Sequence, residues 1–483
     1  MNAREVIKKI TGHNKLYDMG DYIDMGDYID NWLEWYTGNV KAFHNYTIYN
    51  GKKQLQMKRM TLNMGKRVCE DWANLLLNEK TDITVADEYS QQMLHNVLAD
   101  SKFWTKGNEG IEKSFALGIG AFVTTVDNIG TNEEGVLTDL SKSRVKVKFV
   151  NGTKIIPLTF EDDEIIECAF VNVNSDKTYI SVHLKNDRGN YEIHNITCDG
   201  TADSLSFSEE DIEVFDTQSP LPWYQIVKPN VANNVDINSP LGVSIFANAI
   251  DNLKEVDLVW DSYANEFVLG RKRIFVNAQD WAINSRTGEE HDVFDSNDVV
   301  IYVLPEAEDG KQLITDQTQT LRVADHIAAL QNQLNLLGYK CGLGTEHYKF
   351  DSAGVATATQ IVSVNSEMFR NLKKHEILLN DVLIGMSRSV LYALNTFTPY
   401  KVNMEAEITI KFDDSIIVDE TTERTQDIVD VNLGVLSKAE YRAKWYNEDL
   451  GTAQRVIDEI DSFSIADEET TYKAYMEQEP AEV

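Results

Sequence analysis

Apolar residues at helical spacing mark a long helix in the middle of the chain. They recur three or four positions apart and would form one stripe along a helix of roughly 28 residues, or about 40 Å. Ser239 followed by Pro240 is typical of a helix start, with a serine N-cap and a proline in the first turn. The stripe comprises Phe246, Ile250, Leu253, Val256, Trp260, Tyr263 and Phe267.

A second helix follows a stretch with a different pattern. Within residues 271–320, "RKRIFVNAQDW" and "HDVFDSNDVVIYVL" are rich in β-branched and aromatic residues and are separated by turn-forming ones, which predicts a small module of strands. Helical spacing then returns, with the step that makes a seam against another helix. This second stripe comprises Val323, Ile327, Leu330, Leu334 and Leu337. The pattern therefore predicts two helical rods that flank a small β module.

A loop is predicted after the second rod. Gly342 and Gly344 are expected to end the rod, because glycine readily adopts the left-handed conformation that terminates helices. Residues 345–356 are then predicted to form a loop. The sequence from Thr357 to Gln360 matches the capping box T-x-x-Q, which marks a helix entrance.

The third helix is the longest that the pattern predicts. Apolar residues keep helical spacing from Ile361 to about Phe397, so the helix would have some 40 residues and a length of roughly 60 Å if unbroken. Gly385 is the predicted kink in this helix. After Pro399, the stretch "VNMEAEITIKF" predicts a strand.

The first half of the chain has two textures. Residues 1 to about 118 are predicted to be helical, as in "RMTLNMGKRVCEDWANLLLNEK", whose helix should stop near Asn78. Residues 120 to about 225 predict antiparallel strands, in "AFVTTVD", "SRVKVKFV", "EIIECAFVNV", "TYISVHL" and "NYEIHNITC". The tandem repeat "MGDYIDMGDYID", residues 19–30, is interpreted as a local duplication at a helix entrance.

Composition and charge narrow the class of protein. A length of 483 residues suggests about two to four packed units. The 45 basic and 78 acidic residues give a net charge of −33. Proteins that bind nucleic acids tightly usually carry a net positive charge, so tight binding of this kind is not expected. Residues 413–483 alone hold 19 acidic and 6 basic residues, so this end is strongly acidic.

The cysteines and the apolar runs bear on location. The cysteines are too scattered for a metal site or a dense disulfide framework, which favours buried thiols in a reducing compartment. They are Cys69, Cys168, Cys198 and Cys341. The chain shows no secretory signal and no run of about 18 apolar residues, so we expect no export and no membrane contact.

Motifs that would carry catalysis are missing from the sequence. There is no phosphate-binding G-x-x-x-x-G-K-[ST], no H-E-x-x-H, no C-x-x-C and no G-x-S-x-G. In "ALGIGAFV", Gly118 and Gly120 lack the third glycine of a dinucleotide fingerprint and are interpreted as helix-to-strand packing. We therefore expect no catalytic residues and no cofactor.

Metal binding is not indicated either. No two of the nine histidines lie three or four positions apart, and His326 and His375 are interpreted as polar positions on helices. The acidic run at residues 161–164 could bind a hard cation through its carboxylates, but a solvated turn is favoured. Asp413 and Asp414 could also bind a cation, but we expect them to lie at the end of a strand instead.

Two clusters are candidate binding features. Arg271, Lys272 and Arg273 form a compact basic group that could contact phosphates or an acidic partner, although pairing with nearby carboxylates or simple exposure is favoured. The aromatic residues of "NWLEWYTG" could form a binding platform, but a role in the core is favoured. These residues are Trp32, Trp35 and Tyr36.

The order of these elements resembles the portal proteins of tailed bacteriophages, in particular the siphophages of Gram-positive hosts. The resemblance covers nearly the whole chain and rests on "NWLEWYTG", "RMTLNMGKRVCEDWANLLLNEK", "EKSFALGIGAFV" and above all "TATQIVSVNSEMFRNLKKHE", which looks like the start of the family's long helix. It implies a predominantly helical α+β fold with wing, stem helices, a small β-containing clip, a long kinked helix and a helical crown. The tandem repeat departs from the family pattern.

The resemblance also implies a division of the chain. The wing would have a helical part followed by an antiparallel β part, and the stem would be made of two helices on either side of the clip. The implied parts are the N-terminal wing at 1–238, stem helix 1 at 239–270, the clip at 271–320, stem helix 2 at 321–343, the tunnel loop with the long wing helix and strand at 344–412, and the acidic crown at 413–483.

The implied function is a channel for DNA. Portal proteins form rings of twelve subunits at one capsid vertex, through which double-stranded DNA is packaged and later ejected. The partners implied are the terminase large subunit, head-completion or adaptor proteins, and the major capsid and scaffolding proteins, with Arg271, Lys272 and Arg273 in the docking clip. The implied location is the virion, after assembly in the host cytoplasm.

The tunnel loop is the implied site of DNA contact. An acidic chain suits a channel, because each basic contact to phosphate adds affinity that translocation must break. The loop would lean inward and touch DNA without reading its sequence, with His347, Tyr348 and Lys349 nearest the channel. The candidate loop residues are Thr345, Glu346, His347, Tyr348, Lys349, Asp351 and Ser352.

Two other classes of function stay open at this point. One is a soluble helical scaffold or adaptor without a DNA channel, which would form a dimer or small oligomer. The other is a metal-dependent enzyme acting on nucleic acid, which would depend on Asp162 or Asp163. The size of the assembly separates the first from a portal, and a nuclease assay tests the second.

Overall fold

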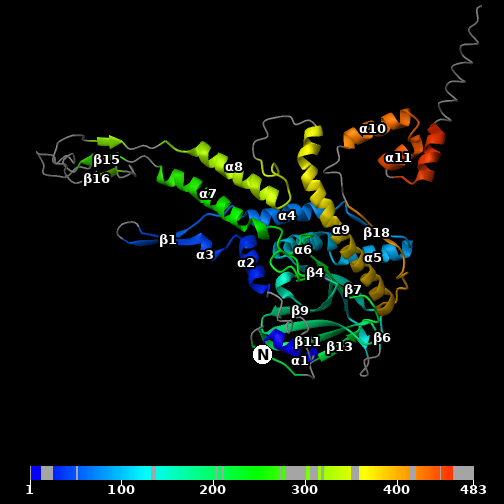
Figure 1. Ribbon diagram of the computed structural model, residues 1–483. Coiled ribbons are helices and arrows are strands. Elements are labelled where there is room, and N and C mark those ends of the chain that lie inside the picture. Colours follow the sequence, from blue (N-terminus) through cyan, green and yellow to red (C-terminus); the bar gives the residue numbers. More distant parts are fainter. Residues whose placement is uncertain are drawn as a thin grey trace, which may run out of the picture. The chain divides into compact units, whose positions relative to one another are not determined.

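A computed structural model gives the fold as two compact units (Figure 1). Unit 1 comprises Met1–Ala353 and Glu367–Asp413, and unit 2 comprises Gly354–Ser366 and Asp414–Val483. The structure describes residues 2–11, 25–49, 53–131, 137–162, 164–201, 204–208, 212–270, 274–277, 301–304, 314–316, 320–349, 358–412, 420–446 and 448–460.

The N-terminal part of unit 1 is mainly helical, but the prediction of a helical region over residues 1 to about 118 is wrong at 45–49, 54–58 and 82–85, where the chain pairs as strands. Its helices are α1 (Ala3–Thr11), α2 (Gly26–Thr37), α3 (Lys41–His44), α4 (Met64–Leu76), α5 (Glu88–Asp100) and α6 (Phe103–Leu117). On α4 the predicted apolar residues Val68, Trp72 and Leu76 are buried, and the helix ends within two residues of Asn78. The second copy of the tandem repeat opens α2, whereas the whole of the first copy, residues 19–24, lies outside the described residues.

Short strands lie between these helices. β1 (Asn45–Tyr49) and β2 (Gln54–Lys58) form a separate antiparallel hairpin. Further along, β3 (Asp82–Val85) pairs with β18 (Ile408–Lys411), which is the core of the strand predicted after Pro399. This small sheet therefore joins two segments that lie more than 300 residues apart in the chain.

The predicted antiparallel β region is confirmed and forms two main sheets. One sheet has the order β12-β11-β10-β9-β8, with β13 pairing with β11, and the other has the order β14-β4-β7. The strands of the first sheet are β8 (Ile155–Glu161), β9 (Glu164–Asn174), β10 (Lys177–Lys185), β11 (Tyr191–Thr201), β12 (Ser204–Ser206) and β13 (Ile212–Asp216). Those of the second are β4 (Gly120–Asp127), β7 (Arg144–Asn151) and β14 (Tyr224–Val227), and a short ladder joins β5 (Gly130–Thr131) to β6 (Leu137–Asp139).

The packing around the sheets explains several sequence features. Val6 and Ile7 of α1 are buried against Ile180 and Ile196 of the six-stranded sheet. Gly120 is the first residue of β4, and a Cβ atom there would lie 2.0 Å from Ser114 Oγ of α6. The glycine therefore lets the strand pack closely against the helix, as predicted. All four cysteines are buried free thiols.

The first rod is shorter than predicted. It is α7 (Ile250–Leu269), a helix of 20 residues that begins after the short 3-10 turn η3 (Ala247–Ala249). The prediction of a helix start at Ser239 and Pro240 is wrong, because this segment is held in an irregular path. The Ser239 side chain accepts a hydrogen bond from the backbone of Leu241 (3.3 Å), and Ile245 donates to Phe115 O (2.9 Å).

The second rod is α8 (Val323–Lys340), and it pairs with α7 in the antiparallel sense. Three side-chain contacts fix the pairing: Arg322 with Glu266 at 2.8 Å, Ser262 with His326 at 3.1 Å, and Asn252 with Gln333 at 3.3 Å. Figure 1 shows the two helices side by side. Beyond them lies the small β module predicted from the sequence, with β15 (Ile274–Asn277) between β16 (Ile301–Leu304) and β17 (Ile314–Asp316).

The longest helix is α9 (Ala358–Phe397), with 40 residues, as predicted. It begins directly after Thr357, although Thr357 itself lies outside the described residues. The kink at Gly385 stays a prediction, but this glycine has a packing role, since a Cβ atom there would lie 2.6 Å from the Gln225 side chain of β14. Ser366–Phe397 is long and apolar enough to cross a membrane by length and composition, yet 56% of its most apolar stretch is buried in the protein, as in a core helix.

Unit 2 contains the acidic C-terminal helices. α10 (Glu420–Asn432) and α11 (Lys438–Tyr446) contact each other, and residues 450–460 are also helical. Asp427 of α10 accepts a hydrogen bond from Trp445 Nε1 (2.8 Å) and pairs with Lys444 (2.6 Å). The prediction that this part of the chain is helical is therefore confirmed by α10, α11 and residues 450–460.

Candidate functional site

The candidate site begins where α8 ends. Gly342 and Gly344 both have left-handed backbone angles, with φ of 79° and 86°, so the glycines end the rod as predicted. The turn between them is held from two sides. Trp72 Nε1 of α4 donates to Cys341 O (3.0 Å), and Asn371 Nδ2 of α9 donates to Gly342 O (3.0 Å).

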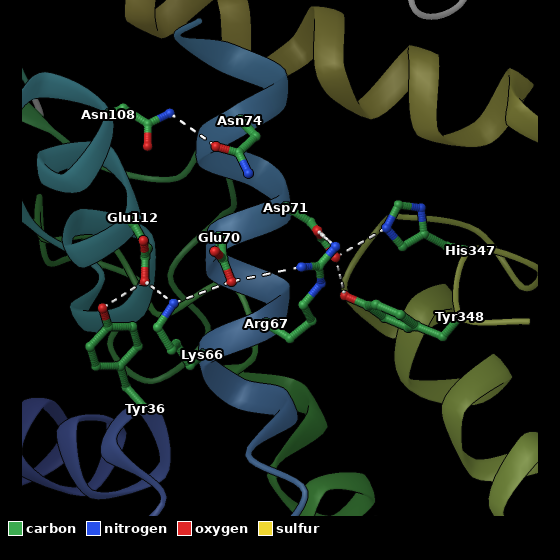
Figure 2. A network of polar contacts seen from close by, with 10 residues as sticks. All are labelled: Tyr36, Lys66, Arg67, Glu70, Asp71, Asn74, Asn108, Glu112, His347 and Tyr348. Atoms are coloured by element: carbon green, nitrogen blue, oxygen red, sulfur yellow. Dashed lines mark hydrogen bonds and ion pairs between the residues drawn. The ribbon is translucent and has the colours of Figure 1, made fainter. Parts of the chain in front are cut away.

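The next residues are tied to α4 by a buried carboxylate. His347 Nε2 and Tyr348 Oη lie 3.1 Å and 3.0 Å from Asp71 Oδ2, and Arg67 pairs with the other oxygen of Asp71 at 2.7 Å (Figure 2). Asp71 is itself 7% exposed. Burial and the neighbouring Asp71 carboxylate raise the pKa of Tyr348 far above its usual value, so its hydroxyl stays protonated and donates.

The network continues along the other side of α4 (Figure 2). Lys66 lies between Glu70 (3.2 Å) and Glu112 of α6 (3.3 Å), and Tyr36 of α2 donates to Glu112 at 2.7 Å. Burial and the Glu112 carboxylate raise the pKa of Tyr36 well above its ordinary value. These paired groups fix the positions of three helices. The arrangement is a structural clamp, in which every charged group of the network has a partner.

The seven predicted loop residues therefore separate into three sets. His347 and Tyr348 are held against α4, whereas Thr345, Glu346 and Lys349 are exposed. Glu346 and Lys349 form an open ion pair at 3.8 Å. Asp351 and Ser352 lie outside the described residues. Asp71 and Arg67 lie about 280 positions earlier in the chain, and no motif or spacing pointed to them as partners of the loop.

The second candidate cluster lies outside the described residues. Arg271, Lys272 and Arg273 come directly before β15, and the structure describes the chain again from Ile274. The aromatic residues of "NWLEWYTG" belong to the core, as the sequence favoured: Trp32 and Trp35 are buried, and Tyr36 bonds Glu112.

The remaining candidates for chemistry have structural roles. Glu161 and Glu164 pair across the turn between β8 and β9 and are exposed. His326 lies on α8 beside Ser262, but His375 on α9 is buried, contrary to a polar position. Its Nδ1 accepts a hydrogen bond from the backbone of Asn230 (3.0 Å), and burial lowers its pKa to about 3.

No metal-binding group was found within the described part of the chain. Within those residues, no three histidine, cysteine or acidic side chains lie close enough together to hold a metal ion. Asp413 and Asp414 of the sequence analysis lie outside that part.

Comparisons with known proteins were made for the sequence and for the fold. The family model described as "Phage portal protein, SPP1 Gp6-like" matches residues 25–453. No curated protein matches the chain by sequence.

Solved structures with a similar arrangement come from gene transfer agent particles. "Neck of empty GTA particle computed with C6 symmetry" has 11% identity and a TM-score of 0.43, and covers 91% of this chain and 98% of its own. "Neck of native GTA particle computed with C12 symmetry" has 12% identity and a TM-score of 0.40, and covers 78% of this chain and 88% of its own.

The family match spans far more than half of the chain and includes α2 to α11, with both rods and the long helix α9 that follows them. This protein therefore belongs to the SPP1 Gp6-like family of phage portal proteins.

Proposed function

We propose that about twelve copies of this chain form a ring-shaped portal at one vertex of a phage capsid, through which double-stranded DNA is packaged and later ejected. The observation that carries the proposal is the family match over residues 25–453. The family is structural, so the proposed role needs no catalytic residue.

In this proposal the two rods form the stem of the ring. α7 and α8 pack against each other in antiparallel fashion, and several apolar side chains on them stay exposed in the single chain. Residues 1–238 would be part of the wing, 271–320 the clip and 413–483 the crown. A ring of such helix pairs has one side towards the lumen and others towards neighbouring subunits.

The loop after α8 would face the DNA. Because His347 and Tyr348 are bonded to Asp71, we assign them the role of anchors and assign DNA contact to the residues around and after them. These are Thr345, Glu346, Lys349, Asp351 and Ser352. A mixture of small, polar and oppositely charged residues suits weak contact with phosphates, which a moving duplex requires.

The remaining partners follow from the proposed place in the particle. The clip, with Arg271, Lys272 and Arg273, would dock the terminase large subunit during packaging and head-completion proteins afterwards. The wing would meet the major capsid and scaffolding proteins. The chain would be assembled in the host cytoplasm and end in the virion.

The mass of the native assembly tests the ring. The chain has a mass of 54.8 kDa, so native mass spectrometry resolves the number of copies directly. We expect a closed assembly of about a dozen chains, as cyclic symmetry permits. A stable monomer or dimer at all concentrations would instead favour the soluble scaffold or adaptor.

Deletion of residues 350–356 tests the loop. This change keeps the anchors His347 and Tyr348, so the ring is expected to assemble with unchanged mass while packaging of DNA is lost. The control keeps the loop intact and carries Asp187→Asn with Arg188→Lys, two exposed residues in the turn after β10. Normal packaging by the shortened chain would contradict a role for the loop.

A further inference from the structure

The hairpin of β1 and β2 has the pattern of a half-buried sheet, but none of its residues is fully buried: Tyr46, Leu55 and Met57 are partly buried and Ile48 is exposed. Its register places Ile48 opposite Leu55 and Tyr46 opposite Met57, so one face is apolar, whereas the other carries polar residues such as Thr47 and Gln56. Such alternation is typical of strands that cover a core on one side. Yet no residue of either strand is buried in the single chain, and Ile48 is 44% exposed.

The root of this hairpin is held firmly. Asp257 of α7, which is buried, lies 3.0 Å from His44 Nε2 and accepts a hydrogen bond from the backbone N–H of Leu62 (2.8 Å). Asp261, one turn further along α7, accepts from the backbone N–H of Met60 (3.0 Å). Two buried carboxylates of the first rod thus fix both chain ends of the hairpin.

Arg59 braces the same root. Its guanidinium lies over the rings of Phe43 and Tyr46, at 4.5 Å and 4.6 Å from their centres, and donates to Phe43 O. A two-stranded hairpin is marginally stable by itself in water. An element that is anchored this well while its apolar face is only partly covered is built to be covered further by something outside the chain.

The charge of the segment indicates what covers it. Residues 35–69 contain seven basic residues and no acidic one, in a chain whose net charge is −33. All 78 acidic residues of the chain lie elsewhere, with 38 of its 45 basic ones. The basic residues are Lys41, Lys52, Lys53, Lys58, Arg59, Lys66 and Arg67, and two of them, Lys66 and Arg67, are paired with Glu70, Glu112 and Asp71 of the same chain.

We propose that the apolar face of the β1–β2 hairpin (Tyr46, Ile48, Leu55 and Met57) is a subunit interface, and that its partner is an acidic surface of a second copy of this chain. A ring needs two different surfaces that complement each other on every subunit. The basic hairpin and the acidic remainder of the chain supply such a pair, and they offset the repulsion between copies of a strongly acidic protein. This inference rests on the proposed portal ring.

The test compares three full-length variants with the wild-type chain by native mass spectrometry and mass photometry over a dilution series. Ile48→Ser with Met57→Ser removes apolar contact. Lys58→Glu, at a position on the polar face of β2, reverses one charge of the basic segment and tests its long-range attraction to the partner. Thr47→Ser with Gln56→Asn alters the polar face and is the matched control. Because all these side chains are at least partly exposed, circular dichroism should show each chain folded as the wild type is.

We expect the apolar variant to raise the concentration at which the assembly dissociates by about tenfold or more, because each buried apolar side chain contributes to the contact. Lys58→Glu should weaken assembly at low salt and do so less at high salt. The control should assemble as the wild type does. Folded variants whose assemblies are as stable as the wild-type ring would overturn the inference.

Two other outcomes separate the possible failures. If the wild-type chain forms only a small oligomer that the hairpin variants dissociate, the interface is supported and the portal ring is not. If the variants form normal rings but the wild-type ring alone is retained on double-stranded DNA, the hairpin contacts nucleic acid and the inference is wrong. A wild-type chain that never associates overturns both proposals.

Discussion

The two ends of the α7 and α8 pair have the same apolar spacing but different surroundings. We call the end of the pair with Ile250 and Lys340 the inner end, and the end with Leu269 and Val323 the outer end. At the inner end, four apolar side chains are buried against the body of unit 1: Leu253, Val256, Leu334 and Leu337. At the outer end Phe267 is 44% exposed and Ile327 is 56% exposed, although both belong to the same stripes. Equal spacing therefore predicts a helix at both ends but a core at only one.

The difference shows that a single chain buries the apolar side chains at only one end of this helix pair. The inner end is part of the chain's own core, whereas the outer end is held by polar contacts such as Arg322 with Glu266. In the proposed ring, exposed apolar residues of this helix pair are natural places for contact between subunits. The β1–β2 hairpin is rooted between these two ends of α7, at Asp257 and Asp261, and shows a similar contrast between a fixed base and a partly exposed face.

The largest effect is expected from Leu337→Ala at the inner end. Removing a fully buried leucine side chain loses its burial and leaves a cavity, which should lower the free energy of unfolding by about 2–5 kcal/mol. Ile327→Ala at the outer end is the matched change on the same helix. It should leave the unfolding of the dissociated chain nearly unchanged and weaken assembly instead. Denaturant unfolding at concentrations below assembly measures both, and equal losses would contradict the contrast.

Asp71→Ala should have the next largest effect, because it removes the shared acceptor of His347 and Tyr348 just beyond the inner end. A half-buried tyrosine hydroxyl without an acceptor costs about 1–3 kcal/mol of unfolding free energy. Glu70→Ala, one position earlier on α4, is the control, since Glu70 is exposed and makes ion pairs with Lys66 and Arg67 only. Proteolysis near residue 349 should become faster in Asp71→Ala and not in the control.

Much of this comparison follows from the sequence. The stripe residues Leu253, Val256, Leu334 and Leu337 were predicted to face a neighbour and are buried, and the β region and the long helix are confirmed. Local spacing succeeds there because each helix or strand satisfies its pattern within a few residues.

Other features depend on contacts between distant residues. Ser239 and Pro240 carry a helix signal, but the chain packs on the end of α6 through Phe115, so tertiary contact overrides the local preference. The bonds from His347 and Tyr348 to Asp71 join residues more than 270 positions apart, and no spacing rule predicts them. The alternation in "YTIY" and "QLQMK" was a usable signal for the hairpin.

Acid should loosen the inner end. The ring of His375 lies 4.7 Å from that of Trp72, which in turn holds the end of α8 through Cys341 O. Burial lowers the pKa of His375 to about 3, so the unfolded chain binds a proton below about pH 6.5 and the folded chain does not until about pH 3. Stability should therefore fall as the pH decreases from about 6.5 towards 3.

At pH 5.5 the loss from this one group is about 1 kcal/mol. His375→Gln should make unfolding less dependent on pH between 7 and 5.5, whatever its effect on stability at pH 7. Denaturant midpoints at the two pH values measure this. Identical pH dependence in the variant and the wild-type chain would mean that other groups, such as the buried His183, account for the acid sensitivity.

The smallest effect on stability is expected from Arg322→Ala at the outer end. The Arg322 side chain is 66% exposed, and ion pairs in such positions contribute little to folding, so the unfolding midpoint should barely move. The pair is nevertheless well formed, because the guanidinium and the backbone N–H of Arg322 both donate to Glu266. These bonds hold the pKa of Glu266 at about 2.

A titration of the Glu266 carboxyl group by NMR therefore detects the loss of this ion pair, which an unfolding measurement does not. The pKa of Glu266 should rise from about 2 towards the usual value of about 4.3 in Arg322→Ala. Because the folded pKa is below the unfolded one, whatever stability the pair adds is present above about pH 4.3 and is lost as the pH falls to about 2. An unchanged Glu266 titration would show that the outer ends of the rods are not joined by this pair, and that contact with a neighbouring subunit must hold them together instead.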